Sequence, residues 1–169
     1  MSAVLGGPAA AAPAAMAIDP AQRVLRQLRL VFNSVKTHFQ QMERLAGVGG
    51  AQIWAMSIIR DQPGVGVNNL AKAMDVRQPT ASNLVRALVA QDLIEVRKEG
   101  ADRREVQLYL QSSGAEVLLR APGPFSGVLP QALAGLELST LHRLEQDLDA
   151  LIRTLDADES AAGIPLSQL

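Results

Sequence analysis

The hydrophobic pattern of the chain changes period within residues 65–110. Over residues 78–90 the apolar side chains recur at i, i+3, i+4 and i+7, which places them on one face of an α-helix. Over residues 94–97 and 106–110 apolar and polar residues alternate, as is typical of half-buried strands. The stretch therefore predicts a short helix, a tight turn, a second helix and a two-stranded hairpin. The apolar positions of the second helix are Ala81, Leu84, Val85 and Leu88.

The opposite face of the 78–90 helix carries uncharged hydrogen-bonding side chains and one arginine. Side chains of this length reach base edges when a helix lies in the major groove of duplex DNA. A helix face that is merely solvated favours Glu and Lys, so the composition of this face favours DNA contact. Arg86 is the best candidate for a bidentate contact with guanine. The candidate DNA-contacting residues are Gln78, Thr80, Ser82, Asn83 and Arg86.

The loop between the two predicted strands is rich in cations. A helix-turn-helix followed by a charged hairpin is a winged helix, and its usual work is to hold duplex DNA. A charged turn can also serve only to keep a sheet edge from pairing with other chains. The candidate contacts here are Arg97, Lys98, Arg103 and Arg104.

This stretch resembles the winged helix of the MarR family of bacterial transcriptional regulators. The resemblance implies that Asp102 braces Arg104 and that Arg104 enters the minor groove. It also implies a mainly α fold with a small β-hairpin, in which N- and C-terminal dimerisation helices flank the winged helix. The residues that carry it are Asn69-Leu70-Ala71, PTASNLV at 79–85, Leu93-Ile94-Glu95, and Asp102-Arg103-Arg104 followed by Val106-Gln107-Leu108.

Helix signals also mark the segments on both sides of the winged helix. Asp19 can cap a long helix that begins with Pro20, and Gly47 can end it. Ser113 with Glu116 forms a capping-box pattern for a helix after the hairpin. Ser139 could cap a last helix, in which leucines recur at three- and four-residue spacing.

Proline sets one boundary in the C-terminal part. The run Ala121-Pro122-Gly123-Pro124 must interrupt any helix there, because proline lacks the backbone N–H and clashes with the preceding turn. The expected organisation is a disordered tail at 1–18, dimerisation helices at 19–46 and 112–155, a winged helix-turn-helix at 47–111 and a flexible tail at 156–169.

The formal net charge is only −1, but the charge is segregated along the chain. Residues 21–60 carry a net charge of +5, residues 68–104 carry +2, and residues 111–169 carry −5. A DNA duplex responds to the local field of a protein rather than to its total charge. The distribution therefore permits DNA binding through the N-terminal two thirds.

Composition limits the other function classes. The chain has no cysteine, so it has no disulfide framework and no thiolate metal site. It lacks a long apolar run and the basic start of a secretory signal, which favours a cytoplasmic protein without a membrane partner. No catalytic set or phosphate-cradling glycine loop can be assembled, so we expect neither an enzyme nor a cofactor. His142 and Glu145 stand at i, i+3, but two ligands do not make a metal site.

The resemblance further implies a cavity between the dimerisation helices and the winged helix that takes small aromatic or phenolic acids. From helix position alone, Arg29, Phe32, Phe39 and Trp54 are its candidate neighbours. A single tryptophan on a central helix is more often a core residue, and we favour that interpretation for Trp54.

Together these patterns predict a homodimeric transcriptional regulator that binds a pseudo-palindromic operator in double-stranded DNA, and the resemblance implies that it is a repressor. Its half-site centres would lie about 34 Å apart, one turn of the duplex. Two alternatives stay open: a winged helix that binds a protein partner without specific DNA binding, and a small-molecule carrier or enzyme.

Overall fold

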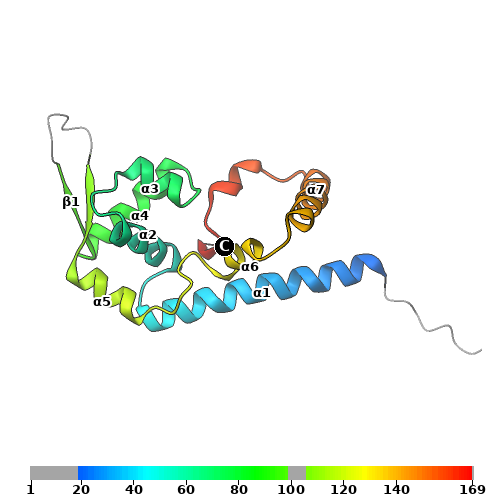
Figure 1. Ribbon diagram of the computed structural model, residues 1–169, viewed down its shortest axis with the longest axis horizontal. Coiled ribbons are helices and arrows are strands. Elements are labelled where there is room, and N and C mark those ends of the chain that lie inside the picture. Colours follow the sequence, from blue (N-terminus) through cyan, green and yellow to red (C-terminus); the bar gives the residue numbers. More distant parts are fainter. Residues whose placement is uncertain (1–18, 99–105, 169) are drawn as a thin grey trace, which may run out of the picture.

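The computed structural model describes residues 19–98 and 106–168. These residues form seven α-helices, a two-stranded antiparallel hairpin and two short 3-10 helices (Figure 1). The elements in chain order are α1 (Pro20–Ala46), α2 (Gly50–Asp61), α3 (Val67–Ala73), α4 (Gln78–Ala90), β1 (Ile94–Arg97), β2 (Gln107–Leu110), α5 (Ser112–Arg120), α6 (Val128–Ala134), α7 (Leu138–Leu155), η1 (Glu159–Gly163) and η2 (Leu166–Gln168). The mainly α fold class with one small hairpin is confirmed.

Helix α1 begins and ends where its sequence signals predict. The side chain of Asp19 accepts a hydrogen bond from the backbone N–H of Ala21 at 3.2 Å, and Pro20 occupies the first turn. At the other end Gly47 adopts a left-handed conformation with φ of 80° and donates its N–H to Glu43. A residue with a Cβ would be strained at that φ, so glycine is the natural terminator.

One hydrophobic core lies between α2, α3, α4, α5 and the hairpin. The apolar face expected for residues 78–90 is buried in this core, and the last turns of α1 join it. Val65 pairs with Leu108 as an isolated bridge beside the hairpin. This pairing ties the segment before α3 to β2. The largest fully buried side chains are Met42, Ile53, Met56, Ile59, Leu70, Met74, Leu88, Ile94 and Leu108.

The helical region after the hairpin is interrupted at the proline-rich run, as its sequence requires. Helix α5 ends at Arg120, and α6 begins only at Val128. In the linker between them, the backbone oxygen of Pro124 lies 3.0 Å from Nε2 of His38 on α1. The linker therefore returns to α1, and α6 then packs along that helix.

Two helix caps differ from the sequence prediction. Helix α5 is preceded by Gln111, and the Ser113 hydroxyl instead donates to the backbone oxygen of Asp92. Helix α7 begins at Leu138 after Glu137, so Ser139 lies inside its first turn. In α5 the serine thus joins the helix to the segment before β1 rather than capping its own N–H groups.

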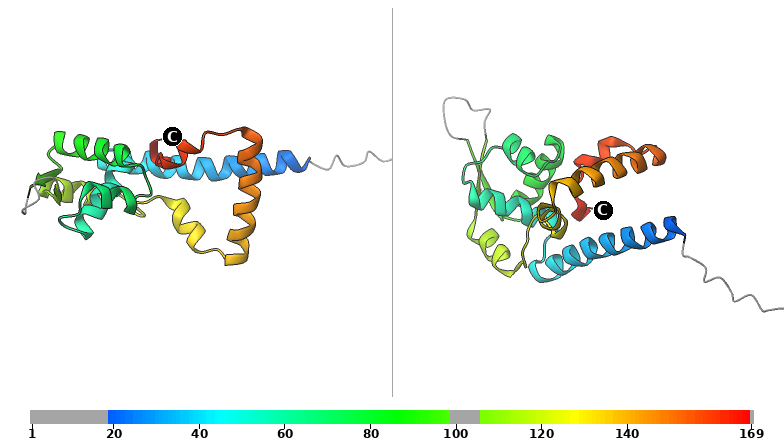
Figure 2. Two further views of the ribbon diagram at one scale, coloured as in Figure 1. Left: turned by 90° about the horizontal axis from the view of Figure 1, so that it is seen from above. Right: turned by 45° about the vertical axis from the view of Figure 1, so that its right-hand side comes forward.

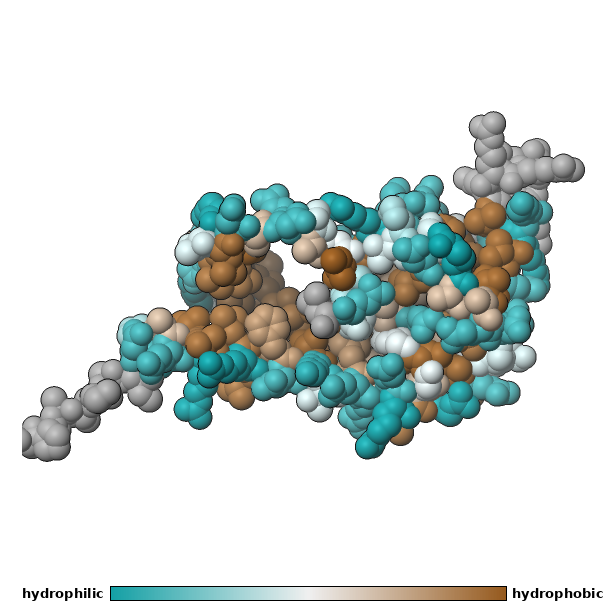
Figure 3. Space-filling model, turned by 180° about the vertical axis from the view of Figure 1, so that it is seen from behind, coloured by the Kyte–Doolittle hydropathy of each residue, from teal (hydrophilic) through white to brown (hydrophobic). Residues whose placement is uncertain are grey.

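The apolar faces of α1 and α7 remain largely exposed. Helix α1 buries only Val35, Met42 and Ala46, and no residue of α7, all of which are described, is buried. Helix α7 runs across the direction of α1 (Figure 2). The space-filling view shows apolar side chains along α1 and around the opening that separates it from α7 (Figure 3).

Residues 156–168, expected to form a flexible tail, turn back toward the winged helix. They form the two 3-10 helices, Pro165 is buried, and η2 packs against α1 and α2. The described end of the chain consequently lies near the middle of the molecule, against α1 and α2 (Figure 1). The expected tail at 1–18 lies outside the described residues.

None of the described helices is both long enough and apolar enough to cross a lipid bilayer.

Candidate nucleic-acid interface

Helix α4 presents the polar face that the sequence singled out. Gln78, Asn83 and Arg86 are exposed, whereas Thr80 and Ser82 are half-buried. The Gln78 amide donates to the Ser82 hydroxyl at 2.9 Å, so these two side chains order each other along one flank. Among the described residues Arg86 has no hydrogen-bond or ion-pair partner, so its guanidinium is available to a ligand.

The turn between α3 and α4 adds a cation that the sequence analysis did not select. Arg77 immediately precedes α4 as its N-cap residue and is exposed. It follows Asp75, whose left-handed φ of 51° reverses the chain after α3. Backbone N–H groups and a cation at a helix N-terminus attract phosphate oxygens. Arg77 precedes the helix and is not part of its apolar and polar periodicity, so that periodicity alone does not identify it.

The other flank of α4 borders a hollow. Thr80, Asn83 and Ala87 line it together with residues 49–52 at the start of α2 and with Ser167 and Gln168. The predicted contacts on α4 therefore divide into two groups. Gln78, Ser82 and Arg86 lie away from residues 167–168, and Thr80 and Asn83 lie beside them.

At the base of the wing, Arg97 is held by its neighbours on the hairpin. Its guanidinium carbon lies 4.3 Å from the ring centroid of Tyr109, a diagonal neighbour on β2, and it forms an ion pair with Glu95, the residue paired with Tyr109. The Tyr109 hydroxyl in turn donates to Oε1 of Gln107 at 2.8 Å. Stacking and pairing restrict Arg97 to a narrow range of orientations while leaving half of its side chain exposed.

Of the remaining wing candidates, only Lys98 is among the described residues. Lys98 is exposed at the end of β1. Asp102, Arg103 and Arg104 lie outside the described residues, so their roles stay predictions.

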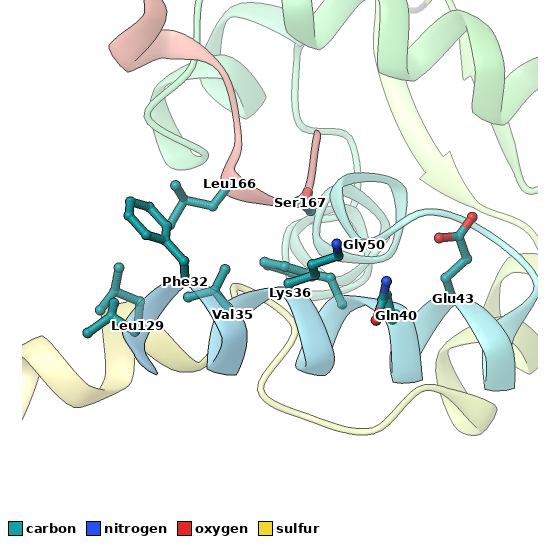
Figure 4. Close-up of a pocket in the computed structure, with 11 residues that line it drawn as sticks. Phe32, Val35, Lys36, Gln40, Glu43, Gly50, Leu129, Leu166 and Ser167 are labelled. Atoms are coloured by element: carbon teal, nitrogen blue, oxygen red, sulfur yellow. The ribbon is translucent and has the colours of Figure 1, made fainter. Parts of the chain in front are cut away.

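The candidate effector residues are divided among three hollows. Phe32 and Phe39 line a cleft of about 360 Å³ on α1, together with Val35, Lys36, Leu129 and Leu166. In Figure 4, Phe32 and Val35 project from α1 toward Leu166, and Leu129 lies beside Phe32. Lys36 supplies the cation of this cleft, and its spacing of four residues from Phe32 is the signal that could have identified it.

Arg29 and Trp54 lie elsewhere. Arg29 lines a separate surface hollow with Gln22, Leu25 and Arg26, nearer the N-terminal end of α1. Trp54 is partly buried against the core, consistent with the favoured interpretation, and it also lines a hollow with Met74, Val76 and Pro165. Phe39, Leu166 and Ser167 border both this hollow and the α1 cleft.

The potential metal ligands of the described residues are dispersed. No group of three or more His, Cys, Asp or Glu side chains gathers among these residues in a way that could hold a metal ion. His142 and Glu145 are both exposed on α7.

Comparison with known proteins agrees with this architecture. Residues 46–105 match the model of the MarR family. The chain is 27% identical over 147 residues to the HTH-type transcriptional repressor NicR of Pseudomonas putida. This alignment covers 85% of this chain and 89% of NicR.

Two solved structures share the fold. The S. aureus MepR–DNA complex aligns with a TM-score of 0.53 at 20% identity, over 81% of this chain and 99% of that one. The structure of Bordetella bronchiseptica BpsR, whose DNA binding is regulated by 6-hydroxynicotinic acid, aligns with a TM-score of 0.51 at 24% identity, over 80% and 99%.

A helix-turn-helix followed by a two-stranded hairpin, built on one shared core, defines a winged-helix DNA-binding protein. The stretch that matches the MarR family model, residues 46–105, contains the helix-turn-helix and β1 of this winged helix.

Proposed function

We propose that this protein is a transcriptional repressor that binds a specific pseudo-palindromic operator as a homodimer and is released by a small aromatic or phenolic acid. The observation that carries the proposal is the exposed polar face of α4, with an unpaired Arg86 among the described residues, next to a cationic hairpin. Such a regulator acts on chromosomal DNA in the cytoplasm and performs no catalysis.

In this proposal α4 lies in the major groove and the wing lies over the adjacent minor groove. Arg86 contacts guanine, and Arg77 and Arg97 contact phosphates that fix the register of the protein on the duplex. The family resemblance assigns Arg104, braced by Asp102, to the minor groove. The proposed contact residues are Gln78, Thr80, Ser82, Asn83, Arg86, Arg97, Lys98, Asp102, Arg103 and Arg104.

A homodimer is supported by the unpartnered apolar faces of the flanking helices. Phe32 on α1 is 61% exposed and Leu155 on α7 is 66% exposed, although each belongs to an apolar stripe. Exposed stripes of this kind are unusual on a monomer and mark contact surfaces. The two surfaces are also complementary in charge, because α1 carries arginines at 23, 26 and 29 whereas the polar face of α7 is acidic.

The effector site proposed here is the α1 cleft. An aromatic ring would pack between Phe32 and Phe39, and the carboxylate of the acid would pair with Lys36. The regulation of BpsR by 6-hydroxynicotinic acid supports an aromatic acid as the class of ligand. Because the cleft on α1 reaches Gly50 at the start of α2, a bound acid would change the spacing of the two α4 helices and lower operator affinity.

Selection of bound duplexes from a random pool at two salt concentrations tests the function. We expect an enriched inverted repeat and an affinity that falls steeply with salt, because binding releases counterions from the phosphates. The alternative, a winged helix that binds a protein partner, predicts no enriched repeat and no effect of Arg86→Ala on DNA affinity.

A further inference from the structure

The segment 158–168 lies against the DNA-binding unit, although the winged helix is complete without it. We propose that this C-terminal segment is an intramolecular ligand of the winged helix that lowers its affinity for DNA. The proposal rests on the function inferred above. Three contacts carry it: one at the helix-turn-helix turn, one in the hollow beside Trp54, and one on the flank of α4.

The first contact is with Arg77. Gly163 packs so closely that a Cβ placed on it would lie 2.9 Å from Cγ of Arg77 and 3.4 Å from its backbone nitrogen. Asp158 is held by two hydrogen bonds from Ser160, at 2.6 Å from the hydroxyl and 2.8 Å from the backbone N–H. These bonds hold the pKa of Asp158 below its usual value, and attraction to Arg77 adds to the shift. The segment thus places a fixed carboxylate near the cation at the start of α4.

The second contact anchors the segment through apolar side chains. Pro165 is buried, and Ile164, Pro165 and Leu166 line the hollow that also contains Trp54, Met74 and Val76. Met74 belongs to the fully buried core, so the segment rests directly on the winged helix. Burial of this apolar surface supplies the attraction that keeps an otherwise polar segment in place.

The third contact reaches the candidate DNA surface. Ser167 and Gln168 share the hollow beside α4 with Thr80, Asn83 and Ala87. Ser167 is also close to the start of α2, since a Cβ on Gly50 would lie 3.0 Å from the Cβ of Ser167. A DNA strand that approaches Thr80 and Asn83 would therefore contact the segment. The segment would have to move away or lie beside the strand.

Charge fixes the direction of the effect. Residues 156–168 contain Asp156, Asp158 and Glu159 and no lysine or arginine. Negative charge beside a helix that contacts phosphates repels the duplex and reduces the attraction exerted by Arg77. A docked segment is therefore inhibitory, and its release raises DNA affinity.

The same segment forms one wall of the α1 cleft. Leu166 and Ser167 line that cleft together with Phe32 and Val35 (Figure 4). A molecule that enters the cleft contacts the segment, so occupancy of the cleft and the position of the segment are coupled.

The test compares the full chain with a variant that lacks residues 157–169 and with Gly163→Val. The valine adds side-chain atoms where even a Cβ would be too close to Arg77, so we expect it to displace the segment without shortening the chain. Ala161→Val is the matched control, because it adds the same kind of bulk to the same segment at an exposed position.

Two measurements are made on each variant. The first is affinity for the selected operator at low salt, and we expect truncation and Gly163→Val to raise it about 5-fold or more. The second is the emission of Trp54, the single tryptophan of the chain. We expect a red shift in both variants, because loss of Ile164 and Pro165 from the hollow exposes the indole to water. Ala161→Val should change neither quantity.

Each remaining outcome has a definite meaning. Unchanged emission after truncation overturns docking of the segment, and a red shift with equal or weaker DNA affinity overturns its inhibitory role. Operator binding by the truncated variant alone would be the strongest support. If neither form binds any duplex in the pool, the proposed function itself fails, and the inhibition fails with it.

Discussion

The winged helix and the helices that flank it bury their apolar residues to opposite degrees. The four residues of the apolar stripe of α4, at 81, 84, 85 and 88, are all buried, whereas none of the leucines along α7 is buried. Both helices have the amphipathic pattern that predicts burial, but within residues 19–98 and 106–168 only the stripe of α4 is covered by other elements. The winged helix therefore buries its own apolar residues, whereas the exposed apolar faces of the flanking helices are the basis of the proposed homodimer.

The largest effect is expected from charge placed on the α7 stripe. Leu148→Glu with Ile152→Glu should abolish dimerisation, because two carboxylates would be buried without partners at the proposed contact. Loss of simultaneous binding to both half-sites should lower operator affinity at least about 100-fold. Analytical ultracentrifugation and operator titration measure the two quantities.

Gln146→Glu is the control, since it adds a carboxylate to the exposed opposite face of α7. A double variant that still sediments as a dimer would show that α7 does not contribute to the contact. Dimerisation would then not explain why the apolar stripe of α7 is exposed.

A smaller effect should follow from a cavity in the winged-helix core. Leu88 is fully buried, and Leu88→Ala should lower the free energy of unfolding by about 2–5 kcal/mol. The neighbouring Val89 is 39% exposed, and Val89→Ala should change the free energy by no more than about 0.5 kcal/mol. Denaturant unfolding at fixed protein concentration measures both. Equal costs at the two positions would contradict the placement of the core.

The sequence predicts the elements of the winged helix well because their signals are local. The bounds of α4, at residues 78 and 90, follow from a complete apolar stripe, and α1 follows from Asp19 and Gly47. Ser113 shows the limit of local signals. Its position fits a capping box, but its hydroxyl instead donates a hydrogen bond to the backbone oxygen of Asp92, 21 residues earlier.

The C-terminal segment and the effector cleft depend on contacts between residues far apart in the chain. Gly163 packs against Arg77, and Pro165 lies in the hollow that contains Trp54, and no local pattern in residues 156–168 indicates these contacts. Arg29 shares a helix face with Phe32 but lies one turn further from the winged helix. Helical position therefore selects the right face of α1, while the extent of the cleft along that face depends on the tertiary fold.

Within the winged helix, the exposed face of α4 should affect DNA recognition without affecting stability. Arg86→Ala should lower operator affinity about 10-fold, because a bidentate contact with guanine is worth about 1–3 kcal/mol. The loss should vanish on duplexes altered at the contacted base pair. Arg86→Lys keeps the charge but not the bidentate geometry, so it should resemble alanine on the operator and the wild type on unrelated DNA. Uniform loss on all sequences would assign Arg86 to phosphate instead.

The smallest effect concerns the base of the wing, where Arg97 lies over Tyr109. Tyr109→Leu should remove the surface on which Arg97 stacks. DNA affinity should then fall about two- to fivefold, since such stacking is worth about 0.5–1 kcal/mol. Tyr109→Phe keeps the ring and gives up only the hydroxyl that bonds to Gln107, so its affinity should stay near the wild-type value. The decisive measurement is the Tyr109→Leu change repeated in an Arg97→Ala background. If the ring acts by orienting Arg97 toward a phosphate, the change has no effect there. An equal loss in both backgrounds would mean that Tyr109 supports the hairpin as a whole.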